Sequence, residues 1–415
     1  MRDKSYRVDV ILPYVMEYGI YVFIFLMFAG KLGTLREAAF YIPLAAWLSR
    51  AIATDRIGFN WRDPLFLSIL FLSLSGLLSS FVNDFSLQGL FIFKKVYLKA
   101  FFLCCVLAAT FRRPESARRC GAFFALAGVV YTFIAFFEMG HDLYSMGKIN
   151  YGEIRNYSTV LLFFLPFTLW QVFLEENNRR TLWQLAAAGE ISAILLVGVR
   201  GGWLALFTVL FLWGLALRKR SWSFYSTIKK ATPFVLLLAI LAFFVFPANY
   251  YFLKKHTFQK IQISLRFEAW KNFIRLSMND ILFGHGLDDN AMSENYRDSF
   301  RQVHGEFPPP EKPTSPHNQY IKFLYQQGVP GLLVYLMLSV LLVRNLLQVN
   351  ILQGSNYSFM FLAALSAAIG EYLVRCFFED RSLIPLGILV GLILASKNTE
   401  RTEHDNTIHP AGNTP

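Results

Sequence analysis

Residues 121–139, GAFFALAGVVYTFIAFFEM, form an apolar run in which Glu138 is the one charged side chain. An α-helix needs about 20 such residues to cross the hydrocarbon core of a bilayer. Comparable runs recur along the chain, and they predict twelve membrane spans, at residues 9–29, 37–54, 64–83, 87–110, 121–139, 158–174, 181–199, 202–217, 232–253, 328–348, 357–376 and 381–396. The sequence therefore predicts an all-α, polytopic membrane protein.

The composition of the 415-residue chain supports this class, because 55% of the residues are hydrophobic and 16% are charged. Soluble domains carry roughly 25% charged residues. The four cysteines lack the spacing of a metal site or of a disulfide framework. The first apolar run is long enough to be a retained helix rather than a cleaved signal peptide.

The formal charge of +12 indicates orientation rather than nucleic-acid binding. Lys and Arg cluster in alternate gaps between the predicted spans, at residues 2–7, 50–62, 112–119, 179–180 and 218–230. Basic loops of this kind face the cytoplasm, so both termini are predicted to be cytoplasmic. The sequence has no basic stripe with interleaved aromatics on a soluble domain, which argues against a nucleic-acid partner.

The gap from residue 254 to residue 327 is the longest stretch outside the predicted spans, and it falls on the periplasmic side. Ile261, Leu265, Trp270 and Phe273 recur in it at helical spacing. We predict an ordered, helical periplasmic loop within a transmembrane domain of residues 1–396, because loops this long are usually functional or disordered and this one has helical periodicity. The polar residues 397–415 are predicted to be a disordered cytoplasmic tail.

His317 is the main candidate for catalysis, within the sequence SPHNQY at residues 315–320. Proline fixes the backbone before it, and a helix that descends into the membrane is predicted to begin there. An imidazole at the membrane surface is suited to taking a proton from a sugar hydroxyl. The alternative is a residue at a helix start that bonds to nearby backbone.

Two arginines are candidates for binding phosphate. Arg200 is followed by Gly201 and Gly202, which allow close approach to the backbone, and a guanidinium matches phosphate oxygens; the alternative is a membrane anchor. Arg266 and Trp270 are four residues apart and share a helix face. That face suits a phosphate beside an aromatic platform, or alternatively an amphipathic helix resting on lipid head groups.

Lys94, Lys95 and Lys99 lie near the outer end of the predicted span 87–110. Basic residues within a span are costly and are functional candidates for that reason, although lysines that reach the interface are the alternative. Arg155 and Asn156 close the periplasmic gap before the span 158–174, where they are predicted to contact a substrate.

These motifs together resemble the superfamily of O-antigen ligases and O-antigen polymerases. The matching parts are Arg200-Gly201-Gly202, the Arg266-x-x-x-Trp270 pair, the Gly-x-Gly turn at residues 284–286, and HNQY at 317–320 followed by GVPG at 328–331. The resemblance covers about residues 150–345. One departure is Val199, where the family often has Ser or Thr.

The resemblance implies a membrane glycosyltransferase of the GT-C class in the bacterial inner membrane, which acts on its periplasmic side without a metal or cofactor. The donor would be a glycan on undecaprenyl diphosphate, and the acceptor a sugar hydroxyl of lipid A–core oligosaccharide. His317 resembles the residue that activates the hydroxyl, while Arg200 and Arg266 resemble those that bind the diphosphate. Asn318 and Tyr320 of the same motif are predicted to contact substrate. A single candidate base favours inversion at the anomeric carbon.

Two other functions fit the sequence. A polymerase of the same superfamily would use another lipid-linked repeat unit as its acceptor. A transporter or flippase for lipid-linked glycans also fits twelve spans, because basic residues within spans can line a path. Against transport, the large outer loop has no counterpart in the first half of the chain.

Overall fold

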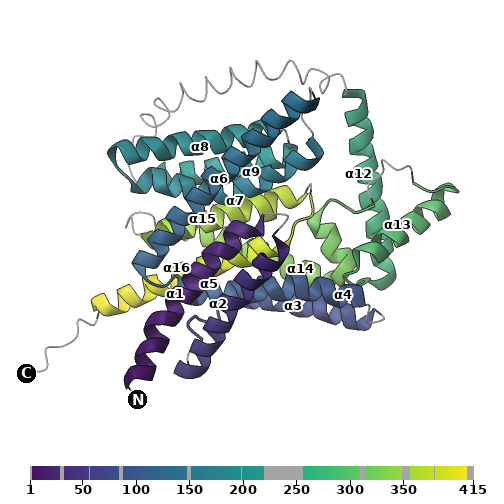
Figure 1. Cartoon of the computed structure of the whole chain (residues 1–415). Coiled ribbons are helices and arrows are strands. Elements are labelled where there is room, and N and C mark those ends of the chain that lie inside the picture. Colours follow the sequence, from purple (N-terminus) through teal and green to yellow (C-terminus); the bar gives the residue numbers. More distant parts are fainter. Residues whose placement is uncertain are drawn as a thin grey trace, which may run out of the picture.

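The computed structural model describes residues 2–28, 32–55, 57–83, 87–146, 151–197, 199–218, 256–308, 314–347, 356–377 and 379–408. These residues form helices joined by turns and contain no strand, as the sequence predicts (Figure 1). The helices are α1 (Arg2–Met27), α2 (Gly33–Thr54), α3 (Pro64–Val82), α4 (Leu87–Ile92), η1 (Phe93–Leu98), α5 (Lys99–Thr110), α6 (Pro114–Met146), α7 (Tyr151–Leu174), α8 (Asn177–Val197), α9 (Arg200–Arg218), α12 (His256–Ser277), η3 (Met278–Asp280), α13 (Asp289–His304), α14 (Gln319–Leu347), α15 (Asn356–Ala368), η5 (Ile369–Val374), η6 (Arg375–Phe377) and α16 (Leu383–Ile408).

Five helical segments are long and apolar enough to cross a membrane, and each coincides with a predicted span. They are Pro64–Val82, Pro114–Asp142, Ile154–Leu174, Gln319–Leu347 and Asn356–Phe377. Three shorter apolar helices, Ile11–Met27, Gly201–Ala216 and Leu383–Lys397, coincide with three more. The predicted spans 37–54, 87–110 and 181–199 fall on α2, on the α4–η1–α5 segment and on α8. The predicted span 232–253 lies outside the described residues, and the count of twelve stays a prediction.

Helices α15 and α16 occupy the centre of the bundle. In the candidate span Asn356–Phe377, which contains α15, 83% of the most apolar 18 residues are buried. Leu386, Leu389 and Ile393 of α16 are fully buried. Helix α16 contacts α5, and α15 contacts both α16 and α7. Helices α1 and α2 form a hairpin against this centre, and α6, α7 and α8 form a layer on one side of it (Figure 1).

Residues 256–308 and 314–327 form a small helical unit beside the bundle, where the sequence predicts an ordered loop (Figure 1). Its own core contains Ala269, Phe273, Met292, Tyr296, Phe300 and Tyr325. The ring of Phe273 stacks on that of Tyr296, with centroids 5.1 Å apart. The predicted helix is present as α12, where Phe273 is buried in this core and Phe267 is 61% exposed.

The Gly-x-Gly turn at residues 284–286 fastens this unit to α14. Gly284 and Gly328 both have positive φ, and a Cβ at Gly328 would lie 2.5 Å from the carbonyl oxygen of Leu282. The backbone N–H of His285 donates to the carbonyl of Tyr325 at 2.8 Å, and that of Val329 to Ile281 at 2.8 Å. Gly328 therefore interrupts α14 so that two backbone segments can meet.

Substitution of Gly328 by alanine is expected to lower the thermal unfolding temperature of the protein purified in detergent. Its φ of 67° and ψ of −165° lie in a region restricted to glycine, where another residue costs about 1–3 kcal/mol, before the clash with Leu282. Gly140→Ala is the matched control, because a Cβ there meets nothing within 4 Å, and alanine favours a helix. An unchanged unfolding temperature in Gly328→Ala would show that the junction is not strained as described.

Helix α16 continues to Ile408, into the segment that the sequence predicts to be a disordered tail. Neither proline nor glycine interrupts residues 397–408, so helical backbone geometry carries past the apolar part. Residues 409–415 lie outside the described residues.

Candidate active site

His317 lies in a turn directly before α14 and has a left-handed backbone, with a φ of 45°. The next residue, Asn318, caps the helix: its Oδ1 accepts from the backbone N–H groups of Tyr320 at 3.0 Å and Ile321 at 3.1 Å. Its Nδ2 donates to the carbonyl of Phe377 at 3.2 Å. A non-glycine residue in this conformation is strained, and such strain gathers at functional sites. The side chain of His317 is 34% exposed, so it remains accessible.

Asp380 faces the imidazole. Nδ1 of His317 lies 3.4 Å from Oδ1 of Asp380, and Nζ of Lys322 lies 3.4 Å from Oδ2. Burial by itself would raise the pKa of the Asp380 carboxyl, but the contacts with His317 and Lys322 outweigh it and hold the pKa well below its usual range. A carboxylate at Nδ1 favours the tautomer in which Nε2 is free to accept a proton.

Trp270 fixes the other side of the turn. Its indole Nε1 donates to the carbonyl of Pro316 at 2.7 Å, so α12 is fastened one residue before His317. Arg266 stands one helical turn before Trp270 on the same face and is half-buried. The structure therefore brings Trp270 next to the candidate base, where its indole N–H bonds to the protein backbone, and places Arg266 one helical turn further along α12.

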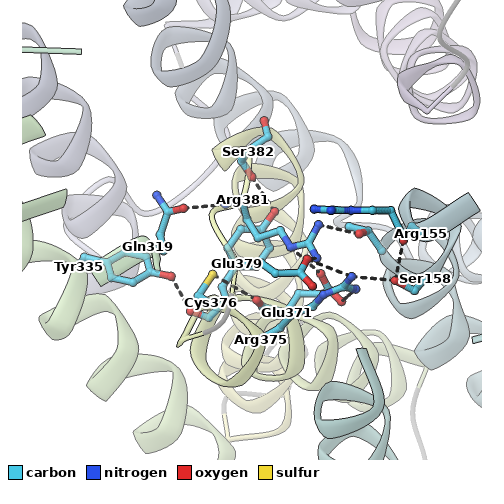
Figure 2. Close-up of polar contacts among 12 residues, drawn as sticks. Arg155, Ser158, Gln319, Tyr335, Glu371, Arg375, Cys376, Glu379, Arg381 and Ser382 are labelled. Atoms are coloured by element: carbon cyan, nitrogen blue, oxygen red, sulfur yellow. Dashed lines mark hydrogen bonds and ion pairs between the residues drawn. The ribbon is translucent and has the colours of Figure 1, made fainter. Parts of the chain in front are cut away.

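Behind the turn lies a buried ion cluster of Glu371, Arg375, Glu379 and Arg381 (Figure 2). Arg375, with a side chain that is 1% exposed, is 3.1 Å from Glu371 and 3.2 Å from Glu379. Arg381 pairs with Glu379, and its backbone N–H donates to Oε1 of Gln319 at 2.7 Å. Glu371 and Arg375 are four residues apart, the spacing at which side chains on a helix meet. The four formal charges cancel, so the cluster offers no free cationic site for a ligand.

Helix α7 contacts the other side of this ion cluster. Oγ of Ser158 accepts from Arg375 at 2.7 Å, and Oγ1 of Thr159 accepts from Arg381 at 2.7 Å. Arg155 and Asn156, one turn earlier, are exposed, and Figure 2 shows the Arg155 side chain extending toward the cluster. Both therefore lie at the edge of the same region as His317.

Arg200 is the first residue of α9, and its side chain lies outside what the structure describes. Its neighbour Gly202 can be placed, because a Cβ there would lie 3.5 Å from the side chain of Ser158. The Arg-Gly-Gly step thus borders the ion cluster on the side of α7. Three separate parts of the chain, α7, α9 and α14, contact the η5–η6 segment, and α12 is joined to the His317 turn through Pro316.

Asn318 and Tyr320, which the sequence predicts to contact substrate, use their polar groups within the protein. The hydroxyl of Tyr320 donates to the carbonyl of Leu373 at 3.2 Å, and its ring stacks on Phe377 with centroids 4.6 Å apart. These contacts attach the start of α14 to the segment that carries Asp380. Their arrangement favours a positioning role.

Lys94 and Lys95 lie on η1 and Lys99 begins α5, so none of the three belongs to the elements that form the His317 turn. Nζ of Lys99 is 2.6 Å from Oε1 of Glu37, and the Lys99 side chain is 7% exposed. Lys95 lines a cavity between α1, α2 and η1, whereas Lys94 is exposed and does not line it. A π-helical turn, η1, carries Lys94 and Lys95; such turns are frequent at functional sites.

Asp380 and Lys322 are the functional candidates that sequence reasoning missed. The feature that could have indicated them is the charged sequence Glu379-Asp380-Arg381 in a short gap between two apolar runs.

The acidic pair Asp288 and Asp289 in the loop has partners within the protein. Asp288 caps α13, and Asp289 lies 3.0 Å from Lys322. Within the described ranges, no three His, Cys, Asp or Glu side chains are grouped as metal ligands.

A family model described as O-antigen ligase matches residues 185–336. The match supports an O-antigen ligase family assignment for this chain. The matched segment contains Arg200, Arg266, Trp270 and His317, and it ends before the ion cluster and Asp380. The family and the apolar helices together support a membrane protein with a ligase- or polymerase-type function in general. A search of curated proteins found no match.

Proposed function

We propose that the protein transfers a glycan from undecaprenyl diphosphate to a sugar hydroxyl of lipid A–core oligosaccharide. The observation that supports this proposal is the contact between Asp380 and His317. The strained and accessible turn that carries His317 lies within residues 185–336, which the family model matches. In this proposal the site faces the periplasm of a bacterial inner membrane.

His317 acts as the general base in this mechanism. A sugar hydroxyl is a poor nucleophile until its proton is taken as the new bond forms. Nε2 of His317 takes that proton, while Asp380 at Nδ1 stabilises the imidazolium that results. Attack from the side opposite the diphosphate inverts the anomeric configuration.

The donor diphosphate is held by arginines outside the ion cluster. Arg375 and Arg381 are already paired with Glu371 and Glu379, so they do not supply net positive charge. Arg200 and Arg266 bind the diphosphate and stabilise its charge as it leaves, and Arg155 with Asn156 contacts the donor at the edge of the site. Two guanidinium groups supply this charge without a metal ion or cofactor.

The decisive experiment is transfer by purified protein with lipid-linked glycan and lipid A–core, in the presence of EDTA. Product is expected with EDTA present, and a second lipid-linked repeat unit as acceptor is expected to give none. Chain growth on that second acceptor would instead assign a polymerase. Movement of lipid-linked glycan across vesicles without any glycosidic bond would assign a transporter.

Arg266→Ala and Arg200→Ala are each expected to weaken donor binding about ten- to a hundredfold, because a hydrogen bond to a charged group contributes about 1.5–3 kcal/mol. Binding of undecaprenyl diphosphate to purified protein measures this effect. Arg297→Ala is the control, since Arg297 is exposed on α13. Undiminished affinity in both variants would remove the two arginines from the site.

A further inference from the structure

A cavity of about 240 Å³ lies between the end of α1, the start of α2, η1 with α5, and the start of α16. Arg36, Glu37, Lys95 and Lys99 are its charged lining residues. Lys99 is neutralised by Glu37 at 2.6 Å, which leaves two cations. Within the described residues, no carboxylate pairs with Arg36 or with Lys95. The cavity therefore carries an excess of positive charge that suits an anion.

The contacts of these two cations are weak. Nη1 of Arg36 donates to the carbonyl of Met27 at 3.4 Å, and Nζ of Lys95 lies 5.6 Å from the centroid of the Phe91 ring. Both side chains can therefore turn toward a ligand without breaking an ion pair. A guanidinium beside an ammonium is a combination that recognises phosphate.

The rest of the lining is mainly apolar, with Phe23, Met27 and Phe28 from the end of α1. A free anion gains nothing from such a wall, whereas a phosphate attached to a hydrocarbon chain does. Sites for drug-sized ligands have volumes of about 300–1,000 Å³, so this cavity fits a head group and the first part of a chain. The remaining chain would extend between helices into the bilayer.

The cavity adjoins the candidate active site through one short segment. Ser382, Ile384 and Pro385 line it, and Ser382 follows Asp380 and Arg381 directly. A ligand beside Ser382 would thus lie two residues along the chain from Asp380, the carboxylate that faces His317.

We propose that this cavity binds the phosphate-bearing head group of a membrane lipid, with Arg36 and Lys95 on the phosphate and Phe23 and Phe28 on the chain. Lys99, held by Glu37, keeps the wall of the site in place. That the lipid is one of the two substrates of transfer rests on the proposed function, whereas the binding itself does not.

Binding to protein purified in detergent tests the proposal with four probes: farnesyl phosphate, farnesol, phosphatidylglycerol and inorganic phosphate. Farnesyl phosphate is expected to bind at least tenfold more tightly than farnesol, and inorganic phosphate is not expected to displace it. The double variant Arg36→Gln/Lys95→Gln is expected to lose at least tenfold in affinity for the phosphate-bearing lipids. Arg36→Lys, which keeps the charge but loses the planar fork, is expected to be intermediate.

Lys271→Gln/Arg297→Gln is the matched control, because it removes the same charge from exposed positions on α12 and α13. Loss for farnesyl phosphate alone identifies an isoprenoid lipid as the source, and loss for phosphatidylglycerol alone identifies a phospholipid. Unchanged affinity in a double variant with a wild-type unfolding temperature would overturn the proposal, as would equal affinity for farnesol or full displacement by inorganic phosphate. His317→Ala is expected to bind these probes as the wild type does, so a failure of the proposed function would be seen separately, in the transfer assay.

Discussion

Replacement of His317 by alanine is expected to lower the rate of transfer by about 10²–10⁴-fold, the range that a positioned general base contributes. The side chain is 34% exposed and contacts Asp380 through Nδ1 at 3.4 Å, so its removal leaves the core intact. Alanine and histidine are both non-glycine residues, so the strain at a φ of 45° stays the same, and the unfolding temperature should stay near that of the wild type. The affinity for donor lipid should also stay near that of the wild type, because the arginines proposed to bind the donor are unchanged. Initial rates with saturating donor and acceptor measure the effect.

His304→Ala provides the matched control. His304 also faces a carboxylate, with its Nε2 3.1 Å from Glu268, but it lies at the end of α13, away from the start of α14. A comparable loss of transfer in this variant would mean that histidine removal acts through the fold of the loop. Wild-type rates in His317→Ala would show that another group takes the proton.

Asp380→Asn distinguishes a positioning residue from a structural one in the same assay. Its depressed pKa means that the stabilisation by this carboxylate is present above the unfolded-state pKa of about 4 and is lost only as pH falls through the lower folded value. Between pH 5 and 8 the wild type therefore keeps this charge. The asparagine variant is expected to lower kcat throughout that range and to leave the KM for donor unchanged, with partial rescue by Asp380→Glu.

Local sequence patterns predicted much of this architecture. Apolar length alone located the five long spans, because a membrane leaves few alternatives to a helix of about 20 residues. The spacing of Trp270 and Phe273 predicted α12. Pro316 predicted a helix that begins at His317, and α14 begins two residues later, at Gln319. Apolar length, helical spacing and proline position depend only on residues close together in the chain, so they can be recognised in the sequence alone.

The partners of these residues could not be predicted, because they depend on segments that are distant in the chain. Trp270 donates to Pro316 across 46 positions, and Lys99 meets Glu37 across 62. Asp380 reaches His317 from just beyond the apolar helical segment Asn356–Phe377. From the sequence, an arginine or lysine near the end of a span is interpreted as an interfacial anchor. Only the folded structure shows whether a carboxylate from another helix lies beside it and forms an ion pair.

Arg375→Ala is expected to destabilise the protein by about 3–5 kcal/mol, the cost of removing one partner from a buried ion pair. Glu371 is 3% exposed and would lose its 3.1 Å partner, while Ser158 would lose its donor. Thermal unfolding in detergent, together with yield from membranes, measures the loss. Arg118→Ala is the control, because Arg118 pairs with Glu175 at 3.3 Å but is 57% exposed, where a pair contributes about 0–1 kcal/mol.

The double variant Glu371→Gln/Arg375→Met tests whether the ion cluster only fills space behind His317 or also orients the segment that carries Asp380. It removes one charge of each sign and leaves Arg381 paired with Glu379, so no buried charge is left without a partner. Stability is expected to recover by more than half relative to Arg375→Ala, since an apolar replacement of a buried pair is often neutral. Transfer should stay reduced if Ser158 and the Arg375 guanidinium orient the segment that carries Asp380. Full recovery of both stability and transfer would show that the cluster only fills space behind His317.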